Sequence, residues 1–239
     1  MRFSGMLKQD LLFQWRHGFY PIYAAVTALY VIILFFLPSG ARPMAAMFMV
    51  FSDTAVLGFF FIGGIILLER SEQLLESLFI TPLTIREYIV SKVVSLSLLS
   101  LLCSLVILLP AGLPSPASLL PVLLGVLVSS ILFILIGMII AVEVPDINHY
   151  FLWSLGFIIF AVPAVLEFLG LFRSRWIYLI PFRGILEIIR AGLEGERAGV
   201  FVLLFGTLIP WLVVAFFAAG ETLRKAVEKR GGQRSWIKF

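Results

Sequence analysis

Apolar residues fill most of the chain in six long runs, and short polar segments separate these runs. A bilayer core of about 30 Å requires about 20 consecutive apolar residues in helical form. Each run is too long for a strand, and the alternation with period two that a membrane β-barrel needs does not occur. The pattern therefore predicts an all-α integral membrane protein with six transmembrane helices, at 20–37, 44–68, 93–113, 118–142, 150–172 and 199–220.

Composition supports this fold class. Of the 239 residues, 61% are hydrophobic and 13% are charged, and the mean hydropathy is +1.08. Soluble domains have about 45–50% apolar and about 25% charged residues. The net charge is +4, and in a chain this apolar the basic excess favours contact with anionic lipid over binding of nucleic acid. A single cysteine, Cys103, excludes a disulfide within the chain.

The first 19 residues carry a separate pattern before the first span. Apolar residues recur every four positions, and polar residues fall between them. This spacing predicts an amphipathic helix that lies in the membrane interface with Trp15 at headgroup level. The alternative is a helix that packs on the protein without touching the membrane. The apolar stripe comprises Phe3, Leu7, Leu11, Trp15 and Phe19, and the polar residues are Lys8, Asp10 and Gln14.

Positive charge divides unequally between the two sides of the predicted bundle. With the N-terminus inside, twelve of the 18 Lys and Arg residues lie on inner segments and six on outer ones. The positive-inside rule then predicts that both termini, including the basic tail 221–239, are cytoplasmic. The outer segment 173–198 is apolar enough to form one or two short helices on or into the outer surface. Within it, Glu187 is spaced for ion pairs with Arg183 and Arg190.

The segment 69–92, between the second and third spans, is longer than a simple connection requires. In its first part, 69–80, acidic and amide residues fall on one side of a helix. Leu75, Leu78 and Phe79 fall on the other side. This pattern predicts a short amphipathic helix on the cytoplasmic side.

The second part of the same segment predicts a sharp corner. Thr81-Pro82 interrupts the helix, because proline disfavours helical geometry in the residue before it. Thr84 stands three residues before Glu87, which is a capping-box pattern for the start of the next helix. We therefore expect a rigid projection that re-enters the membrane as the third span.

This stretch resembles the loop between spans two and three in type-2 ATP-binding-cassette (ABC) transporter permeases. A second, looser resemblance lies at 181–195, and the six-span layout with its N-terminal helix and outer hairpin also agrees. The resemblance thus covers the whole chain. The residues that match the loop motif are Glu69, Glu72, Leu75-Glu76-Ser77-Leu78, Thr81-Pro82-Leu83-Thr84, Glu87-Tyr88 and Lys92.

The resemblance implies a half-transporter subunit in the plasma (inner) membrane. Two such permeases, identical or different, would work with two ATPase subunits to export a drug, a lipid or another amphiphile. Helix 69–80 would be the coupling helix, with apolar anchors and an acidic rim in a groove of the ATPase. The alternative is that the anchors pack on the permease's own N-terminal helix. The implied docking residues are Glu72, Leu75, Glu76, Leu78, Phe79, Thr81 and Pro82.

The chain lacks the sequence motifs of nucleotide-binding, metal-binding and several catalytic sites. No G-x-x-x-x-G-K-[ST] occurs, so ATP and Mg are expected on a separate ATPase polypeptide. Two histidines and one cysteine supply no metal-binding set. Paired catalytic carboxylates and a G-x-S-x-G motif are also absent, which argues against an enzyme. The alternative function is an ATP-independent channel or secondary transporter, although that class usually carries more ionisable residues at mid-membrane.

Two carboxylates fall within the predicted spans. Asp53 lies about nine residues, or roughly 13 Å, into the second span. A carboxylate at that depth marks either a transport pathway or a buried pair. Glu167 lies near the outer end of the fifth span, where a surface ion pair with Arg173 or Arg175 is the simpler interpretation and a place in the pathway the other.

Small and turn-forming residues give two further expectations. Gly58, Gly63 and Gly64 allow the second span to approach another helix closely, either in the same chain or in a dimer partner. Glu143 and Asp146 border the short inner loop and predict a turn cap beside His149.

Overall fold

The computed structural model describes residues 2–72, 84–112, 116–171, 174, 176–177, 180–195 and 198–231. Side chains are described for 4–72, 84–112, 119–171, 174, 176–177, 180–195 and 201–228. Within these ranges the chain is helical and contains no strand. The prediction of an all-α protein is therefore confirmed for the described part of the chain.

In the part of the chain that the structure describes, six helical stretches are long and apolar enough to cross a membrane, as the sequence predicts. The first is α2, the second is a continuous stretch of α3, η1 and α4, and the third begins with α6. The fourth, fifth and sixth lie in α7, α8 and α10. Their limits are Phe19–Phe36, Arg42–Ser71, Ile85–Ala111, Leu119–Glu143, Ile147–Phe168 and Phe201–Glu228.

Among the described residues, two short elements depart from α-helical geometry. The element η1 is a π-helix inside the second span, and η2 is a 3₁₀ turn that ends the third. Helices α1 and α9 are not among the six membrane-spanning stretches. The bounds are α1 Arg2–Arg16, α2 Phe19–Phe36, α3 Arg42–Ala55, η1 Val56–Phe61, α4 Ile62–Ser71, α6 Ile85–Leu108, η2 Leu109–Ala111, α7 Pro116–Glu143, α8 Ile147–Phe168, α9 Pro181–Glu194 and α10 Ala198–Gly231.

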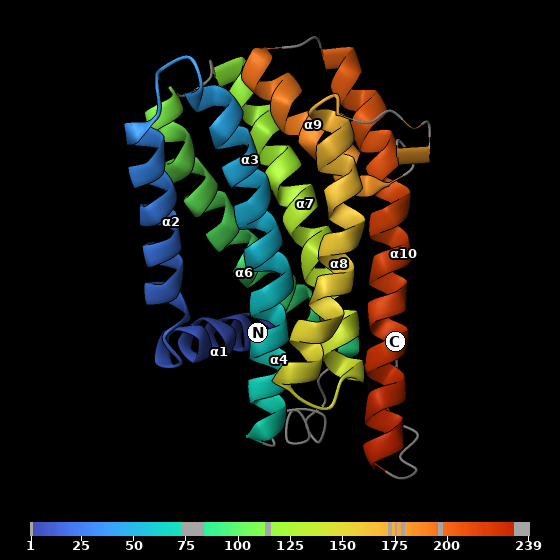
Figure 1. Ribbon diagram of the computed structural model, residues 1–239. Helices are drawn as coiled ribbons and strands as arrows, with labels where there is room; N and C mark the ends of the chain where they lie inside the picture. Colours follow the sequence, from blue (N-terminus) through green and yellow to red (C-terminus); the bar gives the residue numbers. More distant parts are fainter. Residues whose placement is uncertain are drawn as a thin grey trace.

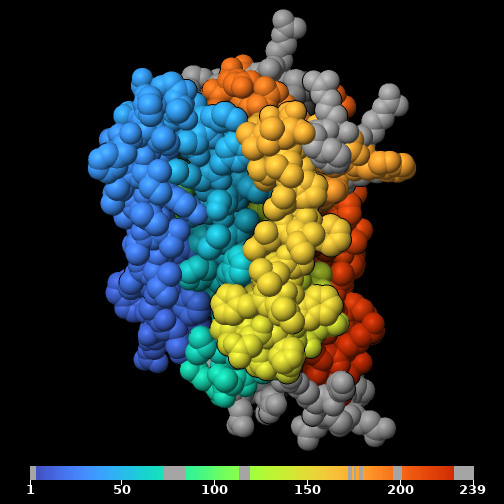
Figure 2. Space-filling model, viewed as in Figure 1, coloured from blue at the N-terminus to red at the C-terminus, as the bar shows by residue number. Residues whose placement is uncertain are grey.

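Helix α7 forms the centre of the bundle. It packs against α3, η1, α4, α6, α8, α9 and α10. Helices α2, α8 and α10 lie at the periphery, and most of their apolar side chains are exposed (Figures 1 and 2). An apolar surface of this kind suits a membrane, where lipid covers the outward faces.

The two ends of the bundle differ. Helix α1 runs crosswise to the spans at one end, and α9 lies at the opposite end (Figure 1). These are called the α1 end and the α9 end below. Gly18, with a left-handed φ of 73°, makes the corner between α1 and α2. A residue with a side chain would be strained in this conformation.

Close packing in the bundle centre depends on glycines of the second span. A Cβ on Gly58 would lie 2.7 Å from the Phe133 Cβ, and one on Gly63 would lie 2.1 Å from the Tyr150 ring. A Cβ on Gly64 would make only ordinary contacts, at 3.7 Å from Phe19. The close neighbours of Gly58 and Gly63 thus belong to the same chain, which answers the question that the sequence left open.

The local caps match the sequence patterns. The Thr84 hydroxyl accepts a hydrogen bond from the Glu87 amide at 3.2 Å, and the Glu87 carboxylate accepts one from the Thr84 amide at 2.9 Å. Asp146 accepts hydrogen bonds from the amides of Asn148 and His149 and so caps α8. The predicted capping box and turn cap are both confirmed.

Helix α9 enters the bundle from the α9 end. Its apolar face is buried against α7, α10, α3 and α8. At its first turn, the Phe182 ring stacks on Phe133 at 5.6 Å and meets Phe157 edge-on at 5.2 Å. Since Phe133 and Phe157 lie near the middle of α7 and α8, α9 penetrates the bundle and does not merely lie on its surface.

The boundary after the second span differs from the prediction. Helix α4 continues without a break to Ser71, so Glu69 belongs to the last turns of the span. The prediction that a separate helix begins at Glu69 is therefore wrong. The remainder of the predicted coupling helix, 73–80, and the Thr81-Pro82 corner lie outside the described residues.

Candidate functional site

Three helices meet at a buried ion cluster at the α1 end of the bundle. Lys92 of α6 is fully buried, and its Nζ lies 2.5 Å from the Asp10 carboxylate of α1. The same ammonium donates a hydrogen bond to the Glu69 carboxylate of α4. Asp10 and Glu69 are themselves only 4% and 3% exposed. The cluster thus joins the N-terminal helix, the end of the second span and the start of the third.

Neutral side chains complete the cluster. The Tyr88 hydroxyl donates to Glu69 at 2.7 Å, and the Ser91 hydroxyl donates to Asp10. About one turn further along α6 than Ser91, the Gln14 amide of α1 donates to the Ser95 hydroxyl at 3.0 Å. The Ser91 and Gln14 contacts join α6 to α1, and the Tyr88 contact joins α6 to α4.

The charges of the cluster do not cancel. Asp10 and Glu69 carry two negative charges against the one positive charge of Lys92. Buried ion pairs are stable only when further hydrogen bonds satisfy the remaining lone pairs, and the donors Tyr88 and Ser91 supply these bonds here. Because every member depends on the others, the geometry of the three helix ends is closely determined.

The cluster reverses part of the expectation for the N-terminal helix. Asp10 and Gln14 point into the protein, whereas Leu11 and Trp15 are 40% and 68% exposed. Asp10 and Gln14, together with the buried Met6, therefore form the packing face, whereas the polar Lys8 is exposed. The apolar residues Leu11, Leu12 and Trp15 lie on the outward face, as a helix at a membrane interface would place them.

Glu69 is likewise reassigned. The sequence pattern groups it with Glu72 in an acidic rim that faces a partner. In the structure Glu69 faces inward to Lys92 and Tyr88, and its burial makes it unavailable to a partner.

Glu72 is the one predicted docking residue that the structure describes. It follows α4 directly as the C-cap residue, and its carboxylate accepts a hydrogen bond from His17 Nε2 at 3.0 Å. The other ring nitrogen of His17 lies 2.9 Å from the Phe13 carbonyl. The Phe13 carbonyl, and secondarily Glu72, raise the pKa of His17 above its ordinary value of 6.5. The remaining docking residues, Leu75, Glu76, Leu78, Phe79, Thr81 and Pro82, lie outside the described residues.

Asp53 lies far from this cluster, inside the second span. It is 1% exposed on α3. Its Oδ2 accepts no hydrogen bond from the described side chains and backbone. Along the continuous helix, Asp53 lies 11 residues, or about 16 Å, from Arg42 at the start of α3.

Glu167 takes part in a second group of charges, near the α9 end. It accepts a hydrogen bond from Arg183 of α9. The expected partners, Arg173 and Arg175, lie outside the described residues. Arg183 also pairs with Glu187, as the spacing in the sequence predicts.

The same group continues along α9. Glu187 pairs with Arg190, and Arg190 lies 2.8 Å from Glu194. Burial alone would raise the pKa of Glu187, but hydrogen bonds from Arg190 and Arg183 hold it below its ordinary value. Glu187 therefore stays ionised at neutral pH, and the row of pairs ties α9 to the end of α8.

A cavity of about 470 Å³ opens beside this row of ion pairs. Its wall combines charged residues of α9 with apolar residues of α3 and α8. The sequence pattern does not single out this cavity, since its walls come from three distant segments. The lining residues include Met44, Met47, Phe168, Arg183, Glu187 and Arg190.

Metal chemistry has no candidate among the described residues. No group of three or more His, Cys, Asp or Glu side chains there could hold a metal ion.

Sequence reasoning missed the cluster around Lys92. In the sequence, Lys92 is noted only as a position of the loop motif, and Asp10 only as a polar residue of the N-terminal helix. No local signal joins them, because Asp10 lies 82 residues from Lys92 in the chain. The one available hint was the presence of a lysine and a glutamate at the ends of two apolar spans, where ionisable residues usually find partners.

Comparison with known proteins gives the chain a family. The family model of the fluoroquinolones export permease proteins matches residues 1–230. Two similar proteins, from two strains of Mycobacterium tuberculosis, each carry the name fluoroquinolones export permease protein. Each is 29% identical over 192 residues, which cover 79% of this chain and 79% of the relative. Together with the six membrane-spanning helices, this match over nearly the whole chain shows that the protein is an integral membrane permease of the fluoroquinolones export permease protein family.

Proposed function

We propose that this chain is the membrane-spanning subunit of an ABC exporter that moves amphiphilic drugs out of the cell. ATP would be bound with Mg and hydrolysed on a separate ATPase polypeptide. Two permease chains, identical or different, would share one transport pathway in the plasma membrane. The α1 end would face the cytoplasm, with both termini, and the α9 end would face outward.

The ion cluster around Lys92 is the observation that carries this proposal. The segment between α4 and α6 begins three residues after Glu69 and ends one residue before α6, which carries Tyr88 and Lys92. Both ends of the segment are therefore held on a rigid, buried base. A docking segment needs a rigid attachment to the spans. Otherwise a movement of the ATPase would deform the connection and would not displace the spans.

The ion cluster also connects the segment between α4 and α6 to helix α1. Asp10 of α1 shares Lys92 with Glu69, and His17, just after α1, reaches Glu72. A displacement of the 73–83 segment would be transmitted through these contacts to the N-terminal helix and, across the Gly18 corner, to α2. This is the mechanical role we assign to the site.

The substrate class rests on the relatives and on the surface chemistry. The two relatives are named for the export of fluoroquinolones. These are flat aromatic compounds that carry both acidic and basic groups. The cavity at the α9 end offers apolar side chains beside arginine and glutamate, which is a suitable wall for such an amphiphile.

A second candidate is an ATP-independent secondary transporter. Asp53 favours it, because a buried carboxylate in the middle of a span is typical of ion-coupled carriers. The two candidates differ in whether transport requires ATP hydrolysis by a partner.

The test is co-expression of the chain with a candidate ABC ATPase from the same genome. We expect the two to co-purify, and we expect a fluoroquinolone to be transported into inverted vesicles only with ATP. The control is the same pair in which the ATPase carries an alanine in place of its phosphate-binding lysine. Transport that continues undiminished in the control, or without any ATPase, would favour the secondary transporter.

A further inference from the structure

The cavity at the α9 end lies between facing sides of two helices. Helices α3 and α9 pack against each other, and Phe168 of α8 completes the lining between them. Most of the α9 lining residues are spaced by four, three and four positions, which places them on one side of the helix. From Arg183 to Glu194 the lining extends about 16 Å along α9. The α9 residues are Arg183, Glu187, Arg190, Leu193 and Glu194.

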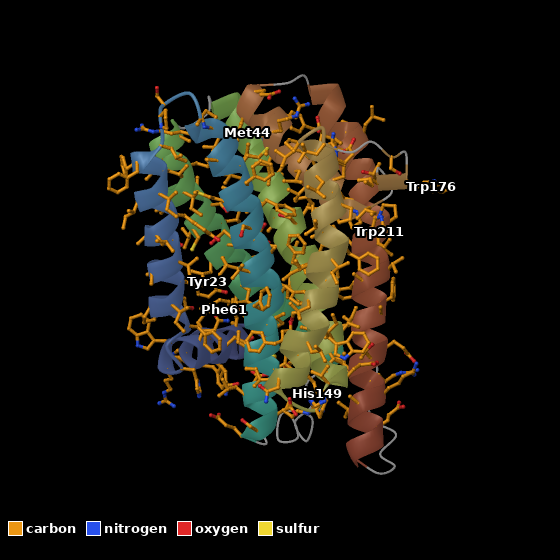
Figure 3. All side chains as sticks on the ribbon, in the orientation of Figure 1. Tyr23, Met44, Phe61, His149, Trp176 and Trp211 are labelled. Carbon is orange, nitrogen blue, oxygen red and sulfur yellow. The ribbon has the colours of Figure 1, made fainter. Side chains whose placement is uncertain are left out.

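The cavity is open at one end and closed at the other. On the α9 side, the exposed fraction of the side chain falls from 52% at Glu194 to 14% at Arg183. On the α3 side, Met44 is 52% exposed and Met47 only 2%, and Figure 3 labels Met44 at the α9 end of the bundle. A molecule can therefore enter at Met44 and Glu194, and the cavity ends at Met47 and Arg183.

The row of ion pairs gives one wall charges of alternating sign. Glu187, in the middle of the row, accepts hydrogen bonds from both Arg183 and Arg190. The Arg183 guanidinium also lies over the Phe168 ring, 4.9 Å from its centroid. The inner members are thus fixed on several sides, and the outer pair, Arg190 with Glu194, is the part that a ligand can reach. In order, the row is Glu167, Arg183, Glu187, Arg190 and Glu194.

The opposite wall is apolar and adaptable. On α3 it consists of Pro43, Met44 and Met47. Methionine side chains are flexible and polarizable, and they fit apolar surfaces of irregular shape. The volume of about 470 Å³ is within the range of small-molecule sites, which is about 300–1,000 Å³. The cavity therefore suits an amphiphile that lays its apolar body on α3 and its polar groups on α9.

The outer ion pair selects the charges of this amphiphile. Arg190 donates to Glu194 at 2.8 Å, so the two present one positive and one negative group side by side at the open end. A molecule with an acid and an ammonium group can place the acid on Arg190 and the ammonium on Glu194. An amphiphile with a single charge would engage one member of the pair and would bring a like charge toward the other, which is unfavourable.

We infer that the cavity at the α9 end is a binding site for a zwitterionic amphiphile. Arg190 binds the acid group, Glu194 binds the ammonium group, and Met44 and Met47 contact the apolar body. Two kinds of molecule share this chemistry. One is a drug with a carboxylate and a protonated amine, and the other is phosphatidylethanolamine, whose headgroup joins a phosphate to an ammonium group. The drug alternative rests on the proposed function, and the lipid alternative does not.

The first test measures thermal unfolding of the purified full-length chain in a detergent with an uncharged headgroup. A ligand that binds the folded chain raises its Tm, and the dependence on ligand concentration gives an apparent affinity. Norfloxacin, which carries a carboxylate and a protonated piperazine amine, is compared with its methyl ester, a cation, and its N-acetyl form, an anion. Dihexanoyl phosphatidylethanolamine is compared with dihexanoyl phosphatidylglycerol, an anion.

We expect at least one zwitterion to bind about tenfold more tightly than its singly charged forms, because each of these lacks one charge-assisted hydrogen bond. Variants assign the two charges. Arg190→Gln should abolish the difference between norfloxacin and its methyl ester, since the ester lacks the acid that Arg190 binds. Glu194→Gln should abolish the difference between norfloxacin and its N-acetyl form. A residue that only supports the fold would not change this discrimination.

A variant that fills the cavity tests its place in the fold. Met44→Trp narrows the open end and should weaken the binding of the preferred zwitterion several-fold. Two matched controls should bind as the wild type does. Arg224→Gln breaks a similarly exposed ion pair with Glu221, also 2.8 Å long, on α10. Leu29→Trp changes a residue of α2 that is as exposed as Met44 but does not line the cavity.

Each outcome decides the inference. A preference for norfloxacin identifies the drug, and a preference for phosphatidylethanolamine identifies the lipid. Equal responses to zwitterions and singly charged forms, a preference for a singly charged form, or wild-type discrimination in Arg190→Gln would overturn the site. If Arg190→Gln does not fold, Glu194→Gln and Met44→Trp decide in the same way. Because the assay uses no ATPase, its failure would leave ATP-driven export untouched, and the reverse also holds.

Discussion

Lys92 of α6 and Glu69 of α4 form an ion pair that water does not reach, and the Asp10 carboxylate of α1 shares the same ammonium. The pair closes the ends of two membrane spans that are consecutive in the chain but joined by the 73–83 segment. It therefore determines the separation of the two points from which that segment emerges. The first prediction follows from its unequal charges.

Removing the positive charge of Lys92 should destabilise the permease more than removing all three charges. Lys92→Met leaves two uncompensated buried carboxylates, and breaking a buried pair in this way costs about 3–5 kcal/mol. The triple variant Asp10→Asn, Glu69→Gln, Lys92→Met removes the charges together and should retain most of the stability. Thermal unfolding in detergent measures both.

The control for this comparison is Lys225→Met. Lys225 is 70% exposed and lies 3.6 Å from Glu221. Exposed pairs contribute about 0–1 kcal/mol, so this variant should unfold like the wild type. Wild-type stability in Lys92→Met would show that the cluster does not hold the helix ends together.

Two neighbouring glycines should respond oppositely to alanine. In Gly63→Ala the new Cβ would lie 2.1 Å from the Tyr150 ring, whose hydroxyl donates to the Phe59 carbonyl at 2.5 Å. Overpacking of this kind costs about 1–3 kcal/mol. In Gly64→Ala the Cβ has ordinary contacts, and alanine should be neutral or slightly stabilising in a helix. Equal unfolding temperatures of the two variants would contradict the packing of α4 against α8.

The contact between His17 and Glu72 should make the α1 end sensitive to pH. The pKa of His17 is raised in the folded protein, chiefly by the Phe13 carbonyl. A raised pKa means that the stabilisation is fully present below the unfolded value of 6.5 and is lost as the pH rises through the folded value.

The measurement is the difference in Tm between the wild type and His17→Gln. We expect the wild type to be the more stable at about pH 5.5 and the difference to disappear by about pH 8.5. The difference should be small, because both side chains are partly exposed. A difference that is constant over this range would exclude protonated His17 as the partner of Glu72.

The orientation in the membrane is tested by labelling single cysteines in intact cells. On a Cys103→Ala background, a cysteine at Ser77 should resist a membrane-impermeant reagent, and one at Ser174 should react. The motivation is the division of the 18 basic residues into twelve and six. Labelling at Ser77 without permeabilisation would invert the proposed topology.

The docking prediction concerns the segment between α4 and α6. Phe79→Ala should abolish co-purification with the ATPase or uncouple hydrolysis from transport, since truncation of a buried interface anchor often costs about 2 kcal/mol or more. Glu72→Gln should weaken association mildly, and more clearly at low salt, where screening is least.

A folding control separates the two interpretations of Phe79. Docking predicts that Phe79→Ala keeps the Tm of the isolated permease. Packing on the permease's own N-terminal helix predicts the reverse, a loss of stability in detergent with coupling intact. Pro82→Ala should give a folded but uncoupled permease, because the first helix would continue past the corner.

Much of the architecture could be read from the sequence. A run of about 20 apolar residues has few stable alternatives to a membrane-spanning helix, so the six spans follow from composition and length alone. The Thr84–Glu87 capping box and the Arg183–Glu187 pair follow from spacings of three and four residues, since both partners lie on the same helical turn. Such local interactions depend little on the rest of the fold.

The partners of buried charges required the tertiary structure. Glu69 fits an exposed acidic stripe by its position in the sequence, and Asp10 fits the outward side of an interfacial helix. Both turn inward, because Lys92, 23 and 82 residues away, becomes available only when α1, α4 and α6 pack together. A sequence pattern shows that a polar residue needs a partner within the membrane, but the packing of distant helices decides which partner it meets.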